Sequence, residues 1–371
     1  MTFRTSISSS HVAVWAFLLV VGASTVALAA SLLETIDQEV TSIYDQSRDA
    51  VVKIHAERQL QIDILPMVPA HRIGTGFFID KDGHILTAAT VVGDADMCWI
   101  EWRGQKINAR IIGRDPQTNL ALLKIEPETG TTTPFLPQGD SDQLRVGSMV
   151  IAIGFPYDRP SVPVMGFVGG VEIQRGGHVF ATSHIRAACR LSPGQGGGPL
   201  LNVHGEVVGM AVAAHMDDEC CALPINAARK ISADILEFGQ AQHPWVGLGV
   251  SERQLAINPT QSNQWQVFIQ QIYSNTPASS VGFRDGDIFV SISSNEVHRL
   301  ADILNTMFYH RVGDKVEFTM LRNGGQEKFL LVVVARPAQE PFGSTPVPQI
   351  GPSQQNQWPT MVPASQDQYG R

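Results

Sequence analysis

The sequence predicts a mainly β protein with more than one domain. Many short apolar runs are separated by turn signals, of which Asp80-Lys81-Asp82-Gly83 is the clearest. The chain has 371 residues, more than one ordinary hydrophobic core accommodates. Hydrophobic residues make up 43% and charged residues 17%, the balance of a globular protein. The net charge of −8, with no basic patch, argues against a nucleic-acid partner.

The N-terminal residues look like an export segment. After Arg4, an uncharged apolar run extends over 12–30 and contains Ala27-Leu28-Ala29, an Ala-x-Ala pattern. These features are typical of a secretory signal, and the run is also almost long enough to span a bilayer as a helix. We therefore interpret residues 1–30 as a signal peptide or a membrane anchor. Either one places the remaining chain in the periplasm or elsewhere outside the cytoplasm.

An oxidising compartment permits disulfides, and four cysteines allow three pairings. The sequence does not choose among them. Residues 215–219 contain one histidine and three acidic residues, but their spacing matches no zinc pattern, so we expect no metal and no cofactor. The four cysteines are Cys98, Cys189, Cys220 and Cys221.

Apolar spacing predicts the first elements. A helix is expected over 31–48, where Ser31 and Glu34 could form a capping box. A strand is expected over 50–54, followed by a loop over 57–72 because of its prolines.

The next elements are strands with one later helix. Residues 73–92 predict a strand, a turn and a return strand, and further strands are expected at 99–102 and 109–112. A hairpin is expected over 202–209. The helix that follows has Asn226 as its expected N-cap.

A glycine-rich stretch, Pro193–Leu200, reads Pro-Gly-Gln-Gly-Gly-Gly-Pro-Leu. Glycines suit a tight turn that needs positive φ and offers N–H groups to an oxyanion. An unrelated glycine-rich loop is the alternative, which the flanking segments oppose. The stretch resembles the nucleophile elbow of HtrA/DegP-type serine proteases, a trypsin-like family, and the resemblance extends over about residues 50–338.

The resemblance implies where a catalytic triad would lie. The general base falls on Thr90 in Leu86–Val92, the aspartate on Asn119 in Asp115–Ile125, and the nucleophile on Gly196. Threonine is no base near neutral pH, and glycine has no attacking atom. The backbone N–H groups of Gly194 and Gly196 could still bind an oxyanion. We therefore expect a serine protease fold that is not an enzyme, with no measurable peptidase activity.

Residues 244–337 resemble a PDZ domain. The segment Trp245-Val246-Gly247-Leu248 fits the loop whose N–H groups hold the C-terminal carboxylate of a peptide. A helix over 300–311 would lie beside the peptide groove. Its side chains Leu304, Met307 and Phe308 indicate a ligand with an apolar last residue.

The full prediction is a trypsin-like double six-stranded antiparallel β-barrel followed by a PDZ domain. Its segments are a signal or anchor at 1–30, the protease-fold domain at 31–239, the PDZ domain at 244–338 and a disordered Pro/Gln-rich tail at 339–371. The expected function is peptide or partner binding in envelope protein quality control or scaffolding, by a chain that could form a homotrimer. The alternative is an active periplasmic serine-type endopeptidase with a rearranged catalytic site.

Overall fold

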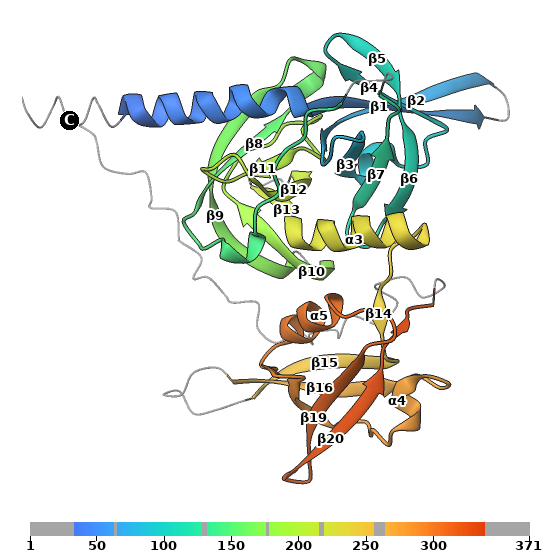
Figure 1. Ribbon diagram of the computed structural model, residues 1–371. Helices are drawn as coiled ribbons and strands as arrows, with labels where there is room; N and C mark the ends of the chain where they lie inside the picture. The colour runs from blue at the N-terminus through green and yellow to red at the C-terminus, as the bar shows by residue number, and fades with distance from the viewer. Residues whose placement is uncertain are drawn as a thin grey trace, which may run out of the picture.

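The computed structural model describes residues 33–337, except 63–64, 128–131, 176–177, 215–218 and 256–263. Two β-rich domains are joined by a short segment over 239–243 (Figure 1). The predicted signal or anchor at 1–30 and the tail at 339–371 lie outside the described residues. No described helix is both long and apolar enough to cross a bilayer.

The first domain begins with a helix over 33–47, which is shown in blue in Figure 1. Seven antiparallel strands follow, in the sheet order β5-β4-β1-β2-β3-β7-β6. A 3-10 turn, η1, precedes β1, and a one-turn helix, α2, follows β3. The bounds are η1 Arg48–Ala50, β1 Val51–Ile62, β2 Leu65–Phe78, β3 His84–Ala88, α2 Ala89–Val92, β4 Met97–Trp102, β5 Gln105–Asn108, β6 Arg110–Asp115 and β7 Leu120–Lys124.

The second half of this domain is a closed barrel of six antiparallel strands, in the order β10-β13-β12-β11-β8-β9. Two short 3-10 turns flank β8, and helix α3 ends the domain. The bounds are η2 Ser141–Gln143, β8 Met149–Gly154, η3 Pro156–Asp158, β9 Val162–Arg175, β10 His178–Ala187, β11 Pro199–Leu201, β12 Val207–Ala214, β13 Cys220–Pro224 and α3 Ile225–Phe238.

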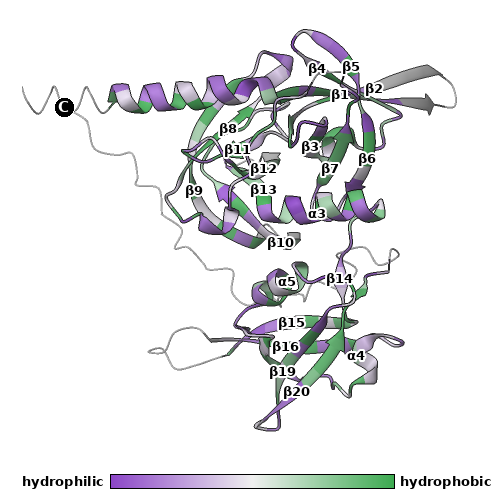
Figure 2. Ribbon diagram, in the orientation of Figure 1, coloured by the Kyte–Doolittle hydropathy of each residue, from purple (hydrophilic) through white to green (hydrophobic). Residues whose placement is uncertain are grey.

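One hydrophobic core joins the two sheets of the first domain. Phe77 of the first sheet and Ile151 of the barrel belong to the same buried cluster, together with Ile231 and Ile235 of α3. Because apolar positions four apart lie on one helix face, α3 covers the junction between the sheets. In Figure 2 the hydrophobic residues are concentrated on the strands around which both domains are built.

The second domain is a sheet in the order β15-β16-β17-β19-β20, with β18 paired to β17 and β14 paired to β21. Its core is a separate cluster that includes Ile269, Phe289 and Phe318. The predicted mainly β architecture, two barrel-like sheets followed by a further β domain, is therefore confirmed, except that the first sheet has seven strands rather than six. The bounds are β14 Pro244–Trp245, β15 Leu248–Leu255, β16 Gln264–Ile272, α4 Pro277–Ser280, β17 Ile288–Ile292, β18 Asn295–Glu296, α5 Leu300–Phe308, β19 Lys315–Arg322, β20 Gly325–Val332 and β21 Val334–Ala335.

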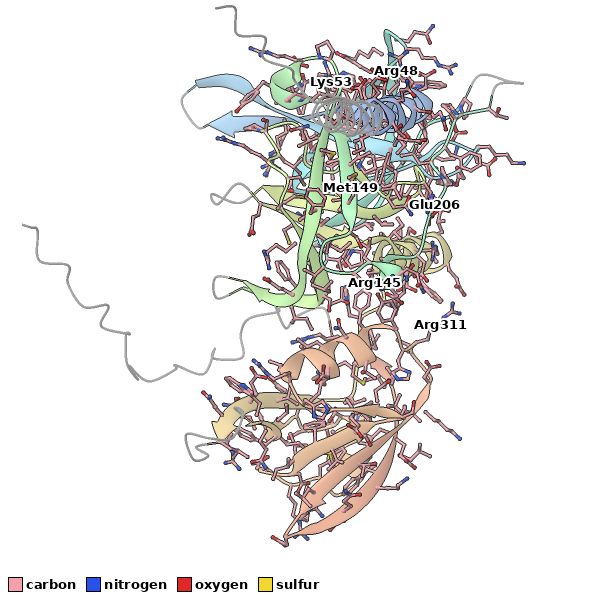
Figure 3. The ribbon with its side chains drawn as sticks, turned by 90° about the vertical axis from the view of Figure 1, so that its left-hand side faces the viewer. Arg48, Lys53, Arg145, Met149, Glu206 and Arg311 are labelled. Carbon is pink, nitrogen blue, oxygen red and sulfur yellow. The ribbon has the colours of Figure 1, made fainter. Side chains whose placement is uncertain are left out.

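Helix α5 connects the two domains. The Oδ1 atom of Asn305 accepts hydrogen bonds from the Ser183 N–H at 2.8 Å and the Thr182 hydroxyl at 3.2 Å, both on β10. Phe308 is 3% exposed and packs in the core of the first domain, with the Lys230 ammonium 5.3 Å from its ring centroid. Arg311, which follows α5, lies at this junction (Figure 3). Phe308 was predicted to line the peptide groove, and that prediction is wrong because the ring packs in the barrel domain.

Two local predictions are also wrong. The loop expected over 57–72 is a long hairpin of β1 and β2, because β2 pairs with β3 only over 76–78 and its prolines need no donor on the other side. Asn226 is inside α3, whose N-cap is Pro224, and its Nδ2 donates to Asp140 Oδ1 at 2.7 Å. The helix predicted over 31–48 is present over the described residues 33–47. The hairpin predicted over 202–209 is the turn between the paired strands β11 and β12.

Candidate functional site

The elbow, residues 193–198, is held by main-chain contacts. Gly194 has φ +96°, and a Cβ there would lie 2.3 Å from the Phe155 carbonyl oxygen. Gly197 has φ +84°, and its Cβ would lie 2.2 Å from the Thr75 carbonyl oxygen. Both contacts are closer than real Cβ atoms allow, so only glycine fits at these two positions.

Gly196 differs from the glycines beside it. Its φ is not positive, and a Cβ built there would meet no described atom within 4 Å. Its carbonyl oxygen accepts a hydrogen bond from the Thr75 N–H at 2.9 Å, which fixes the main chain. A side chain at this position would therefore point into open space without disturbing the elbow.

Thr90 and Asn119 lie in direct contact. Asn119 follows the turn after β6 and has φ +56°, a conformation that asparagine tolerates better than most residues. Its Oδ1 accepts a hydrogen bond from the Thr90 N–H at 2.9 Å, and its Nδ2 donates to the Val212 carbonyl at 2.8 Å. Both ends of the amide are thus committed to the main chain.

Strand β12 brings this pair to the elbow. The Ala211 carbonyl accepts a hydrogen bond from the Gly197 N–H at 2.7 Å, and the next carbonyl, that of Val212, holds Asn119. The structure therefore brings Thr90, Asn119 and Gly196 to one site, where the two sheets of the first domain meet. We call this the elbow site.

Gln195 is a feature of the elbow that the sequence did not reveal. Its side chain is 2% exposed, and its Oε1 accepts from the Ser192 N–H at 2.7 Å. Its Nε2 has no partner among the described residues. A buried donor without an acceptor is costly, so this amide is a strained feature of the elbow.

The candidate oxyanion donors remain available. In the part of the chain that the structure describes, the N–H groups of Gly194 and Gly196 donate to no other group. Other side chains that could assist lie elsewhere. His84 is held by Asp80, with 2.6 Å between Nδ1 and Oδ2, and His204 lies on the exposed turn between β11 and β12.

The carboxylate loop, residues 245–248, is fixed by a different set of contacts. Gly247 has φ +88°, and a Cβ there would lie 2.2 Å from Thr276 Cβ. The carbonyls of Val246 and Gly247 accept hydrogen bonds from Ala278 N–H at 2.9 Å and Tyr273 N–H at 3.0 Å. Val246 and Gly247 are buried, yet among the described residues their own N–H groups have no acceptor. Main-chain N–H groups without a partner in the protein are open to a ligand, and a carboxylate would satisfy them.

Strand β15 continues from this loop and pairs on one side only, with β16. Its other side, next to α5, is an open edge that we call the peptide edge. At the end of this edge, Glu252 of β15 accepts hydrogen bonds from the Arg299 guanidinium at 2.8 and 3.0 Å and from the Leu300 N–H at 2.8 Å. Burial opposes ionisation, but these hydrogen bonds prevail and lower the pKa of Glu252.

A second buried carboxylate connects the domain linker to the elbow site. Asp115 is 3% exposed and pairs with His243 Nε2 of the linker at 2.9 Å. Its other oxygen accepts hydrogen bonds from the hydroxyl and the N–H of Thr118, which precedes Asn119. Although burial opposes it, the contacts with His243 and Thr118 lower the pKa of Asp115. Sequence reasoning missed this contact because its two partners are 128 residues apart.

The described residues contain no group of three or more His, Cys, Asp or Glu side chains that could hold a metal ion. His215, Asp217 and Asp218, which the sequence raised as a possible metal site, lie outside those residues.

Comparisons with known proteins support both domains. Residues 74–210 match a trypsin-like peptidase domain and residues 245–333 match a PDZ domain. Probable periplasmic serine endoproteases, DegP-like, of Pseudomonas putida and Chlamydia trachomatis are 29% and 28% identical over 72% of this chain. The chain spans about 57% and 55% of the length of these two relatives.

Solved structures show the same fold. An HtrA-type protease AlgW with a decapeptide is 22% identical, with a TM-score of 0.66 over 80% of this chain and 99% of that chain. A serine endoprotease from Yersinia pestis is 21% identical, with a TM-score of 0.59 over 80% and 98%.

The prediction that the chain is not an enzyme is contradicted by these relatives, which are named serine endoproteases. That prediction relied on the residue types at three positions. The chain thus contains a region that matches a trypsin-like peptidase domain, followed by one that matches a PDZ domain, and it is similar in sequence to DegP-like endoproteases.

Proposed function

We propose that this chain is an extracytoplasmic, DegP-like protein that captures polypeptides by their C-terminal ends at the peptide edge and presents them to the elbow site. The assigned role is protein quality control or scaffolding in the cell envelope. The relatives' names, which place them in the periplasm, support the location, and the apolar run over 12–30 supports export.

The observation that carries this proposal is the pair of N–H groups at Val246 and Gly247, which have no acceptor among the described residues and lie beside an edge of β15 that no described strand pairs with. A peptide carboxylate accepts from the loop, while the peptide main chain extends the sheet along β15. Half-buried Leu248 and Leu304 offer an apolar contact for the last side chain of the ligand. We therefore assign peptides with a free C-terminus and an apolar last residue as ligands, with Kd in the micromolar range, or about −8 kcal/mol.

Fluorescence anisotropy on the full chain tests the assignment. A labelled peptide ending in a free valine carboxylate should bind at least tenfold more tightly than the same peptide ending in an amide. Changing Leu304 to lysine should weaken the carboxylate peptide, while changing the exposed Leu330 to lysine should not. Equal affinity for the acid and the amide would refute carboxylate recognition without depending on any variant.

Self-association is a further part of the proposal. Met165, Phe167 and Val171 of β9 are 48%, 47% and 54% exposed, and alternate residues of a strand share a face. We propose that this apolar row contributes to a homotrimer. Light scattering should give three times the chain mass, and Phe167→Glu should lower it, whereas exposed Val203→Glu should not. A natural chain that remains monomeric at micromolar concentrations would exclude the trimer.

Anchoring or export by residues 12–30 is tested by reporter fusion. Alkaline phosphatase fused after Gly239 should be active, because the enzyme needs an oxidising compartment to form its disulfides. An inactive fusion, with a cytoplasmic reporter active at the same point, would place the chain in the cytoplasm.

The second candidate function is serine-type endopeptidase activity, favoured by the relatives' names and by the open oxyanion donors of the elbow. Ser192 is the hydroxyl residue nearest to the elbow in sequence and is half-buried. Casein cleavage and fluorophosphonate labelling that disappear in Ser192→Ala, but persist in Ser280→Ala, would assign the activity to this site. Cleavage unchanged in Ser192→Ala would exclude that serine.

Variants that restore the triad residue types step by step give a second test of endopeptidase activity. The open space at Gly196 accommodates a serine, so Gly196→Ser should fold normally. Adding Thr90→His and Asn119→Asp should raise casein cleavage above that of Gly196→Ser alone, because a serine nucleophile needs a base and an oriented imidazole. Equal rates in the two variants would show that the base lies elsewhere.

A further inference from the structure

The barrel brings two of the four cysteines together. Cys189 follows β10 and Cys220 begins β13, and these strands pair with Ala187 opposite Cys220. The Cys189 N–H donates to the Ala187 carbonyl at 2.9 Å, which turns the chain back beside β13. The two thiols are in hydrogen-bonding contact, and the residues are 3% and 0% exposed in one buried cluster.

Contacts with strand β9 fix the position of Cys189. The Ala188 N–H donates to the Phe167 carbonyl of β9 at 2.8 Å. Gly166, also on β9, leaves so little room that a Cβ there would lie 2.6 Å from Cys189 Cβ. The close approach of the two thiols therefore follows from main-chain contacts on both sides rather than from one flexible side chain.

The other pairings do not fit the fold. Cys220 and Cys221 are adjacent on a strand, where successive side chains point to opposite faces. They accordingly belong to different buried clusters, with Cys221 in the core that joins the sheets. Cys98 is in a third cluster, inside the seven-stranded sheet, where burial raises the pKa of its thiol to about 12.

We propose that Cys189 and Cys220 form a disulfide in the oxidising compartment where the proposed function places this chain. The Cys189 thiolate attacks an oxidised dithiol partner of the thiol–disulfide exchange class, which gives a mixed disulfide. The Cys220 thiolate then displaces that partner. One Sγ–Sγ bond forms, two protons leave the thiols, and the partner's disulfide is reduced to two thiols.

The local chemistry suits this order of events. The hydrogen bond from Cys220 lowers the pKa of the Cys189 thiol, whereas the same contact and burial raise the pKa of Cys220. Once the two thiols have come into contact, Cys189 is therefore the one that ionises more readily. Since both thiols are buried in the folded barrel, the bond forms while the barrel is still closing.

The bond would enclose the elbow in a loop. Residues 190–219 lie between the two cysteines and include Gly194, Gly196 and β12. The disulfide would link the segment that precedes the elbow to β13, which follows the elbow in the sequence. A covalent tie there stabilises the barrel without adding a contact to the peptide edge.

The pairing is tested directly on the full chain, refolded in a buffer of oxidised and reduced glutathione, alkylated and digested without reduction. Mass spectrometry should find the peptides that contain Cys189 and Cys220 linked, with Cys98 and Cys221 alkylated after unfolding. A dominant link between any other two cysteines, or four alkylated thiols, would overturn the proposal. Because refolding is done in a defined buffer, this result does not depend on whether the chain is exported.

Thermal unfolding gives a readout that packing alone would not produce. Closing a loop of about 30 residues should raise the Tm of the oxidised chain by roughly 10 °C over the reduced chain. Cys189→Ala, Cys220→Ala and the double variant should each lose the dependence on reductant, while Cys98→Ala and Cys221→Ala should keep it. A natural chain whose Tm is unchanged by reductant would contradict the bond.

Discussion

The elbow and the carboxylate loop both present main-chain N–H groups, but the fold secures them differently. The elbow is fixed against backbone oxygens, namely those of Phe155 and Thr75, which cannot move aside. The carboxylate loop is fixed at one glycine, Gly247, against Thr276 of the turn before α4, whose Cβ can move only if that half-buried turn shifts. The elbow should therefore be the more rigid of the two, and substitutions in it should have the larger effect on stability.

The largest effect is expected for Gly197→Ala. Its Cβ would collide with the Thr75 backbone and occupy a positive φ, so we expect a loss of about 4 kcal/mol or failure to fold. Gly196→Ala is the matched control and should change the free energy of unfolding by less than about 1 kcal/mol. Urea denaturation compares them, and equal losses would show that the elbow is not held as described.

Asp115→Asn should cost about 2–3 kcal/mol at pH 7, because it removes a buried charge from His243 and Thr118. The folded pKa of Asp115 is lowered, so its contribution is present above the unfolded pKa and is lost as the pH falls through the folded pKa. The stabilities of the natural chain and the variant should therefore converge at acidic pH. A constant difference from pH 7 to pH 2, measured by urea denaturation, would contradict this.

Gly247→Ala should cost about 2 kcal/mol, less than Gly197→Ala, because the half-buried turn that carries Thr276 can shift more easily than the buried strand that carries Thr75. It should also weaken binding of the carboxylate peptide by tenfold or more. Gly249→Ala, whose Cβ would lie 3.2 Å from Gln271 Cβ at a position without positive φ, should be much milder. The comparison between loops fails if Gly247→Ala proves more damaging than Gly197→Ala.

Asn119→Asp should cost about 1–2 kcal/mol at pH 7, because a carboxylate would face the Val212 carbonyl that the amide now donates to. At low pH the protonated carboxyl can donate again, so the difference from the natural chain should shrink. Stability measured at pH 7 and pH 3 checks this, and a variant equally stable at both values would exclude the contact.

The smallest effect is expected for Glu252→Gln. Glu252 and Arg299 are partly exposed, with 18% and 47% of their side chains accessible, so the loss should be at most about 1 kcal/mol. The effect should appear instead in peptide binding, since the pair closes the end of the peptide edge. Salt should reduce the difference between the two chains. If Glu252→Gln lowered the free energy of unfolding as much as Asp115→Asn does, burial would not explain the different contributions of the two carboxylates.

Sequence reasoning succeeded where the determinant is local. The glycines of the elbow, the turn at 80–83 and the carboxylate loop are fixed by backbone conformations that few other residues adopt. It failed where partners are distant. Phe308 is apolar and helical in either domain, and only the tertiary arrangement places it in the barrel core. The disulfide pairing remained open in sequence for the same reason, because it depends on the register of β10 against β13.

The reason for Gly247 also changed. The sequence analysis assigned Gly247 to a loop whose N–H groups hold a carboxylate, whereas the structure shows that glycine is required there because a Cβ would strike Thr276. The strand β5 was not expected either, since its four residues alternate too briefly to stand out.

Because Phe308 belongs to α5 but packs in the core of the first domain, the two domains are not thermodynamically independent. Unfolding the PDZ domain withdraws an aromatic ring from the barrel, and unfolding the barrel exposes that ring on the PDZ domain. The full chain should thus melt with a cooperativity that its separated halves do not have. An isolated PDZ fragment would expose the Phe308 ring, which favours aggregation. Measurements on separated domains would therefore describe a surface that the full chain buries.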